Sequence, residues 1–94
     1  MSHFYDKDGT SMTLMEWAKQ MEDTKYGCIG RTTLPDGRLV LTDWLGLDLQ
    51  LSAGPPLIFE TMVFNGDDEI QERYSTMAHA EAGHKRLVKE LLGT

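Results

Sequence analysis

The longest apolar stretch of the chain runs from Leu57 to Phe64, between a Gly-Pro-Pro turn signal and an Asn-Gly pair. Its β-branched and aromatic residues favour a strand over a helix, and the stretch is too short to cross a membrane. Its odd and even positions are both mainly apolar, which is typical of a strand that is covered on both faces. Glu60 is the exception. We therefore expect residues 57–64 to form the central strand of a sheet.

Three more segments have the composition of strands: residues 26–33, 38–51 and 70–74. The first two are joined by Pro35-Asp36-Gly37, in which proline presets the backbone and glycine accepts a left-handed conformation, so we expect them to form a hairpin. Because the connections are short, strands that follow one another in sequence should also be neighbours in the sheet. These features predict an antiparallel meander.

Leucines occupy most of the odd positions between residues 39 and 51. Alternation with a period of two predicts that these leucines face the core. It also places Trp44 on the other face beside Gly46, where the missing side chain leaves room for a large group. Asp43 interrupts the leucine pattern. Either a bulge near residues 44–46 turns Asp43 outward, or its buried carboxylate has a partner.

Two helices complete the predicted fold. Thr13 and Glu16 have the spacing of a capping box, and apolar residues at helical spacing follow them. Ser75 and Thr76 cap a closing helix that ends near residue 92. We expect an α+β fold in a single domain, residues 1–94, in which an N-terminal helix and a C-terminal helix pack on an antiparallel four-stranded meander. The first helix is expected to cover an edge or part of the second face.

The closing helix carries His84 on its apolar stripe, where a buried histidine needs a hydrogen-bond partner. We expect Glu60 on the central strand to accept its proton, with Arg73 and Tyr74 nearby. Such a group is either a satisfied core network or an acid/base site. His79 lies five residues before His84, on a different face, so the two histidines lack the spacing of a helix-borne zinc site.

Three consecutive carboxylates, Asp67, Asp68 and Glu69, follow the central strand. Such a run can hold a hard cation, but the alternating ligands, the glycine and the distal glutamate of a calcium loop are missing. We therefore expect a solvated turn at this point, and neither a metal nor another cofactor in the protein.

The sequence has 15 acidic and 9 basic residues, which gives a net charge of −6. This charge argues against a nucleic acid or a membrane as the partner and favours a basic protein, although acidic residues also simply keep a small domain soluble. Cys28 is the single cysteine, and the sequence shows neither a leader nor a long apolar run. We expect a soluble protein of the cytoplasm.

Several short motifs, taken together and in order, resemble one family. They are Phe4-Tyr5-Asp6, Asp8-Gly9, Glu16-Trp17, residues 33–37, Trp44-Leu45-Gly46-Leu47-Asp48, residues 54–64, Arg73-Tyr74-Ser75-Thr76 and Ala82-Gly83-His84. They are similar to a family of small uncharacterised proteins encoded by phages and by bacterial genomes that carry prophages. Members of that family have a histidine where this chain has Leu49 and a valine where it has Asp43, so a site that uses that histidine is incomplete here. The resemblance implies a phage accessory protein without a particular activity.

Three functions of different classes stay open. The first is a small acidic accessory protein, not an enzyme, that binds and inhibits a host protein in the bacterial cytoplasm; an anti-defence (anti-CRISPR-like) inhibitor that acts on a basic nucleic-acid-binding surface fits this description. The second is a small-molecule binder, for instance of a nucleotide, that uses Trp44, Arg73 and Tyr74. The third is an enzyme that uses Glu60 and His84. The candidate binding residues are Trp44, Asp48, Glu60, Arg73, Tyr74, His84, Asp67, Asp68 and Glu69.

Two helices are few for a sheet whose central strand is apolar on both faces. If the first helix does not cover the second face, Val40 and Trp44 join one set of central-strand side chains in an exposed apolar patch. A two-fold dimer would bury that patch on both partners at once. Alternatively, the N-terminal segment with Trp17 folds over the sheet and completes a monomeric core.

Overall fold

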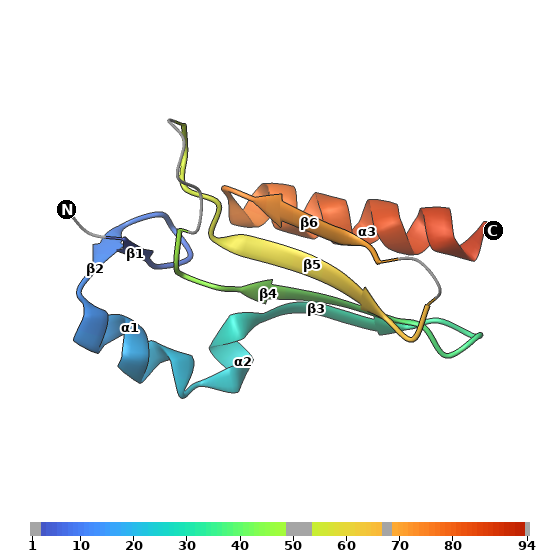
Figure 1. Cartoon of the computed structure of the whole chain (residues 1–94), viewed down its shortest axis with the longest axis horizontal. Coiled ribbons are helices and arrows are strands. Elements are labelled where there is room, and N and C mark those ends of the chain that lie inside the picture. Colours follow the sequence, from blue (N-terminus) through green and yellow to red (C-terminus); the bar gives the residue numbers. More distant parts are fainter. Residues whose placement is uncertain (1–2, 49–53, 67–68, 94) are drawn as a thin grey trace.

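The computed structural model of the chain describes residues 3–48, 54–66 and 69–93. Strands β3 to β6 form one antiparallel sheet in chain order, and β1 and β2 form a separate hairpin (Figure 1). The expected α+β fold with a four-stranded antiparallel meander is thus confirmed. The elements in chain order are β1 (Phe4–Tyr5), β2 (Ser11–Met12), α1 (Leu14–Met21), α2 (Thr24–Gly27), β3 (Cys28–Thr33), β4 (Leu39–Trp44), β5 (Phe59–Phe64), β6 (Gln71–Tyr74) and α3 (Met77–Leu92).

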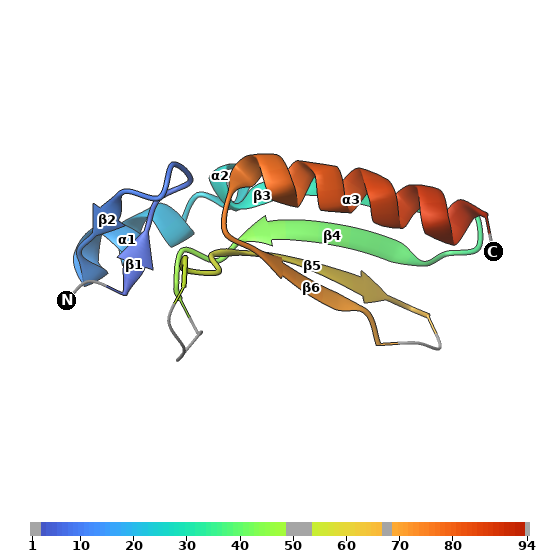
Figure 2. The same cartoon turned by 90° about the horizontal axis from the view of Figure 1, so that it is seen from above.

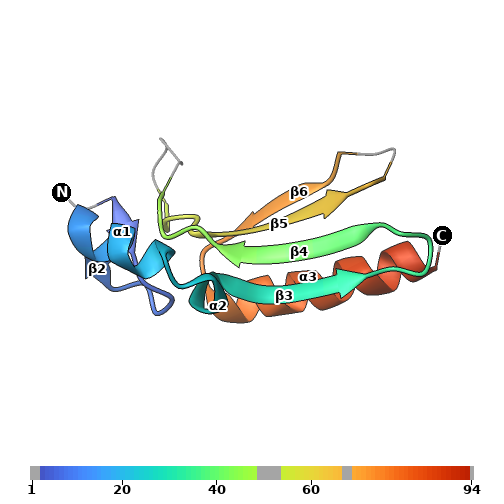
Figure 3. The ribbon, with the colours of Figure 1, turned by 90° about the horizontal axis from the view of Figure 1, so that it is seen from below.

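Helix α3 runs along one face of the sheet and contacts all four strands. It lies in front of the sheet in Figure 2, and Figure 3 shows the opposite side, along which no described helix runs. We call the covered side the helix face and the other side the open face. Both helix starts follow the prediction, since Thr13 and Glu16 form the capping box of α1 and Thr76 caps α3.

The N-terminal elements pack against one end of the sheet and do not extend along its second face (Figures 1 and 2). Two indole N–H groups contribute to this attachment, together with the backbone hydrogen bond from Tyr5 to the carbonyl of Gly46. Trp17 donates to the carbonyl of Leu45 at 2.9 Å, and Trp44 donates to the carbonyl of Tyr5 at 3.0 Å. The N-terminal segment therefore closes the end of the core, and none of the described helices covers the open face.

The alternation along β4 is confirmed, but the predicted assignment of its faces is wrong. Val40, Thr42 and Trp44 are buried on the helix face, whereas Leu39 and Leu41 are only half-buried on the open face. Periodicity shows which side chains share a face and cannot show which of the two faces the helix covers. Val40 and Trp44 therefore contribute nothing to an exposed patch, and the leucines do.

Trp44 lies beside Gly46, as expected. A Cβ atom at Gly46 would lie 2.4 Å from the ring of Trp44 and 2.8 Å from that of Trp17, and this glycine has a φ of +68°. The ring of Trp44 also packs edge-on against Tyr26, with centroids 4.9 Å apart. The large indole therefore fills the end of the core on the helix face, whereas the sequence pattern predicted leucines on that face.

Among the described residues, the central strand β5 is covered on one face only, which contradicts the expectation that both faces are covered. Phe59 is fully buried under α3, whereas Met62 is half-buried and Phe64 is 40% exposed. A strand of this composition is expected to have both faces covered. Of the differences from the sequence-based prediction, its exposed face bears most on function.

Beneath α3 the core divides into two apolar clusters. One gathers around Trp44 and Phe59 and the other around Val40 and Leu87. Along β4 and β5 the row that separates the two clusters is polar, because Thr42 pairs with Thr61 between the apolar pairs. The protein therefore buries hydroxyl groups at the centre of its sheet, and these groups must find hydrogen bonds there.

Candidate functional site

His84 lies above the polar row of the helix face and is 9% exposed. Its Nε2 atom is 2.8 Å from the hydroxyl of Thr32, and its Nδ1 atom is 2.8 Å from the hydroxyl of Thr42. Burial lowers the pKa of His84. A neutral ring, with one donor and one acceptor nitrogen, matches two hydroxyls that can each donate or accept. The expected bond to Glu60 is wrong, because Glu60 lies on the open face.

The hydrogen-bonded row continues across the sheet. The hydroxyls of Thr42 and Thr61 are 2.5 Å apart, and the hydroxyl of Tyr74 donates to Thr61 at 3.1 Å. Burial raises the pKa of Tyr74. Among the described residues no buried side-chain polar atom lacks a partner. The residues around His84 therefore form a satisfied core network. The pair of Glu60 and His84 that an acid/base site requires does not form.

The threonines of this network were not among the predicted site residues. Thr42 and Thr61 occupy the same alternating positions as the buried Val40 and Val63. With the faces of β4 assigned correctly, that periodicity would have placed two hydroxyls opposite His84. The missing information was which face the helix covers, because the alternation itself was visible in the sequence.

The sheet separates the residues expected to bind a nucleotide. On the open face Glu60 accepts hydrogen bonds from Arg73 at 3.0 Å and from the side chain of Gln71. Trp44 and Tyr74 are buried on the helix face. Since Arg73 lies across the sheet from both aromatic rings, these three side chains do not line one surface.

The remaining predicted residues lie apart from these groups. Asp48 accepts a hydrogen bond from the backbone N–H of Leu57 at 3.3 Å, and Glu69 is exposed. Asp67 and Asp68 lie outside the described residues. Within residues 3–48, 54–66 and 69–93, no group of three or more His, Cys, Asp or Glu side chains could hold a metal ion.

The open face carries a compact apolar patch on its two central strands. Leu39 of β4 pairs with Phe64 of β5, and Leu41 pairs with Met62. Residues that pair directly across an antiparallel ladder share a face, so the four side chains adjoin one another. An apolar patch on a sheet face that no described element covers is typical of a binding surface.

Asp43 continues the leucine row on the open face, where it pairs with Glu60. β4 pairs regularly with β5 from Leu39 to Trp44, and just beyond this ladder the N–H groups of Leu45 and Gly46 both donate to the carbonyl of Ile58, at 2.7 and 3.2 Å. Two residues that face one across a ladder form a bulge, so the predicted bulge near residues 44–46 is confirmed. A further register shift lies in β3, between Cys28 and Gly30. Burial and the neighbouring Glu60 raise the pKa of Asp43. The Asp43 carboxylate makes no hydrogen bond or ion pair with another described residue.

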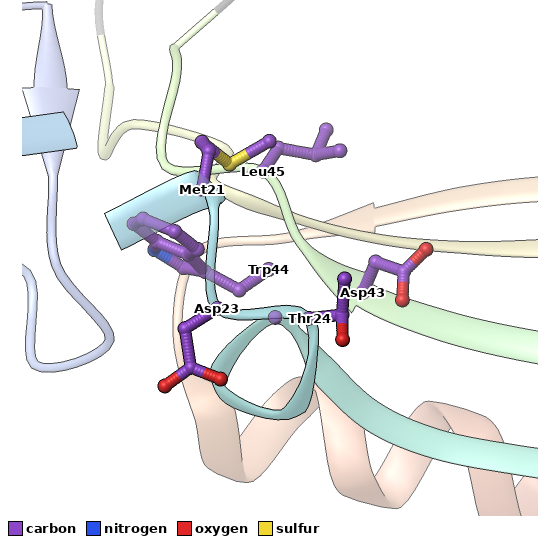
Figure 4. Close-up of a pocket in the computed structure, with 7 residues that line it drawn as sticks. Met21, Asp23, Thr24, Asp43, Trp44 and Leu45 are labelled. Carbon is purple, nitrogen blue, oxygen red and sulfur yellow. The ribbon is translucent and has the colours of Figure 1, made fainter. Parts of the chain in front are cut away.

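A shallow cavity of about 230 Å³ lies between the α1–α2 turn and the end of β4. Figure 4 shows Met21 and Leu45 on one side of it, with Asp23, Thr24 and Asp43 from the turn and the strand. Asp23 caps α2 by accepting hydrogen bonds from two backbone N–H groups. Binding sites for small molecules usually measure about 300–1,000 Å³, so this cavity has room for a single side chain.

Helix α1 exposes large apolar side chains next to this cavity. Leu14 is 57% exposed, Met15 is 77% exposed and Met21 is 44% exposed, and none of the residues of α1 is buried. Glu16 and Glu22 stand beside them and are also exposed. We call these five residues the α1 surface.

Comparison of the chain with family models, with curated proteins and with solved structures finds no match. None of the described helices is long and apolar enough to span a membrane. Two surfaces of the described residues combine exposed apolar side chains with charge: the α1 surface and the open face.

Proposed function

We propose that the protein is a small acidic accessory protein of phage or prophage origin that binds and inhibits a host protein in the bacterial cytoplasm. The bound surface of the host protein is basic and normally contacts nucleic acid. The observation that carries this proposal is the α1 surface, where Leu14, Met15 and Met21 are exposed beside two carboxylates. An amphipathic helix ordinarily buries its apolar stripe, so this helix is suited to a partner.

The chemistry of the α1 surface points to a basic partner. Glu16 and Glu22 carry negative charge on the same helix as the exposed methionines, and the whole chain has a net charge of −6. Carboxylates around an apolar patch attract lysine and arginine and repel nucleic acid. Methionine side chains are flexible and adapt to irregular surfaces, which favours binding to a protein.

The cavity adds an anchoring point to the α1 surface. Met21 belongs to both, and Leu45 lies beside it on the same side of the cavity (Figure 4). A side chain of the partner that enters the cavity would contact the apolar Met21 and Leu45 with Asp23 and Asp43 close by, and residues buried at an interface in this way carry most of its binding energy. The resemblance to phage-encoded proteins supports a host protein as the partner.

Affinity capture from a bacterial lysate tests the proposal. We expect the tagged protein to retain a basic, nucleic-acid-binding protein in stoichiometric amount at low salt, and added DNA should compete for it. Leu14→Glu should abolish the capture. Leu92→Glu is a matched control, because Leu92 is also 57% exposed but lies at the end of α3. Equal capture by both variants, or the absence of a stoichiometric partner at low salt, would contradict the proposal.

A further inference from the structure

The open face holds two charged side chains that have no partner among the described residues. Of the charged strand residues on this face, Glu60 and Arg73 form an ion pair with each other. Arg31 is exposed on the outer strand β3, and Asp43 is half-buried on β4. Neither makes a hydrogen bond or ion pair within the described residues. Within the part of the chain that the structure describes, an arginine and an aspartate without partners therefore adjoin the apolar patch.

These two charges lie at opposite corners of a near-rectangle. Arg31 pairs with Leu41, and Cys28 pairs with Asp43. These four residues therefore form two successive cross-strand pairs of β3 and β4 on the open face. Neighbouring strands lie about 4.8 Å apart, and residues two positions apart along a strand are separated by about 6.8 Å. The diagonal that joins Cys28 to Leu41 continues to Phe64 on β5, and Arg31 and Asp43 lie on either side of it.

A half-turn about this diagonal maps the open face onto itself in a complementary way. It exchanges Arg31 with Asp43 and Leu39 with Met62, and it leaves Leu41 and Phe64 close to the axis. Thr33 is brought opposite the neutral Gln71, and Glu60 is brought beside Arg31. Opposite charges therefore meet opposite charges, apolar side chains meet apolar side chains, and no two like charges of the described strands coincide.

We propose that the open face binds the open face of a second copy of this chain about a two-fold axis along this diagonal. Arg31 of each protomer then pairs with Asp43 of the other, and the two apolar patches cover each other. A single self-complementary patch that serves both subunits is the ordinary arrangement of a two-fold dimer. The strands of the two sheets cross at roughly 70°, which belongs to the orthogonal class of sheet packing.

The size of the face determines the strength of the association. Four strands of about six residues present about 400 Å² on each copy, so the interface is smaller than the roughly 1,200 Å² in total at which stable complexes begin. We therefore expect a reversible dimer that forms at high micromolar concentration. This contact does not use the five residues of the α1 surface, but it shares Asp43 with the cavity beside them.

Reversal of the two charges tests the arrangement. Arg31→Glu and Asp43→Lys should each make the protein monomeric in analytical ultracentrifugation, because like charges then face each other across the axis. An equimolar mixture of these two variants should form a dimer again, since every contact between positions 31 and 43 in the mixed pair joins opposite charges. Lys85→Glu and Glu81→Lys change the net charge equally on the exposed side of α3 and should leave the association unchanged.

A second readout uses the native cysteine, which lies on the axis. Packed sheets are about 10 Å apart, so a bismaleimide of that span should join Cys28 to its copy in the unchanged protein and in the mixture, and not in either single variant. Circular dichroism verifies that the variants are folded; if one is not, Arg31→Gln and Asp43→Asn, which should weaken association several-fold, replace them. A protein that stays monomeric at 1 mM, or a mixture that stays monomeric, overturns the proposal.

Discussion

The two faces of the sheet are built from alternate residues of the same strands, yet they satisfy their polar groups in different ways. On the helix face, the hydroxyls of Thr42 and Thr61 bond to each other and to the groups on either side. On the open face, Asp43 makes no such bond within the described residues, although it is half-buried. The helix face is thus complete within the monomer, whereas the open face has a charge available to a partner.

This difference shows where the chain uses its residues for stability and where for binding. Burial under α3 contributes to folding, and each polar group that it covers is paired. Exposed apolar side chains on the open face contribute little to folding, because they are only partly removed from water. Substitutions of the same kind on the two faces should therefore have unequal effects on the free energy of unfolding.

The largest expected effect compares two phenylalanines of β5. Phe59 is fully buried on the helix face, and Phe64 is 40% exposed on the open face. Phe59→Ala should lower the free energy of unfolding by about 3–5 kcal/mol, because it leaves a cavity in the core. Phe64→Ala should cost less than about 1 kcal/mol. Urea unfolding of dilute samples measures both values, and equal losses would remove the distinction between the faces.

A second comparison uses one threonine on each face of the sheet. Thr42→Val keeps the shape of the side chain but leaves Nδ1 of His84 without its partner, so it should cost about 1–3 kcal/mol of unfolding free energy. Thr33→Val, at an exposed position of β3, should change the unfolding free energy by less than about 0.5 kcal/mol. If Thr42→Val is as harmless as Thr33→Val, the network does not stabilise the core.

The pH dependence of unfolding should identify His84. Burial lowers its pKa from the ordinary value of 6.5, so below that pH the unfolded chain binds more protons than the folded chain. The free energy of unfolding should therefore fall as the pH is lowered from 6.5 through the folded pKa of His84. Urea unfolding at several pH values and NMR titration of the ring measure this. His79→Gln, at an exposed position, should keep the dependence, and a His84 ring that titrates above 6.5 would contradict it.

The smallest expected effect on unfolding has the opposite sign. Burial and Glu60 raise the pKa of Asp43, so its contribution to stability is present at low pH and is lost as the pH rises through the folded pKa. At pH 7 Asp43→Asn should therefore raise the melting temperature of the monomer slightly and weaken self-association. Glu81→Gln, at an exposed position of α3, should do neither. A lower melting temperature for Asp43→Asn would indicate that the carboxylate stabilises the fold.

The sequence was sufficient for the architecture because local signals determined it. The Pro35-Asp36-Gly37 turn, the capping box of Thr13 and Glu16 and the cap at Thr76 each appear where they were predicted. Short connections then left the antiparallel meander as the order of strands. Local turn and cap chemistry acts over a few residues, so it can be recognised without knowledge of the tertiary contacts.

The sequence was not sufficient for the site, because the site depends on which face α3 covers. Leu39, Leu41 and Trp44 gave the correct alternation and the wrong core face. Because of the same error, Glu60, which lies across the sheet, was predicted as the partner of His84, and its two threonine partners were not predicted. Hydrophobicity alone favoured the leucines as core residues, whereas the structure buries Trp44, whose indole donates a hydrogen bond to the carbonyl of Tyr5.

The most direct test of the division between the two faces measures association and stability in the same variant. Leu41→Lys places a charge near the proposed two-fold axis, on a strand whose alternate residues remain buried under α3. Analytical ultracentrifugation should show a monomer at concentrations at which the unchanged protein forms dimers. Urea unfolding of dilute samples should show a loss of less than about 1 kcal/mol. A dimer that persists in this variant, or a loss of several kcal/mol, would contradict the assignment of binding to the open face and of stability to the helix face.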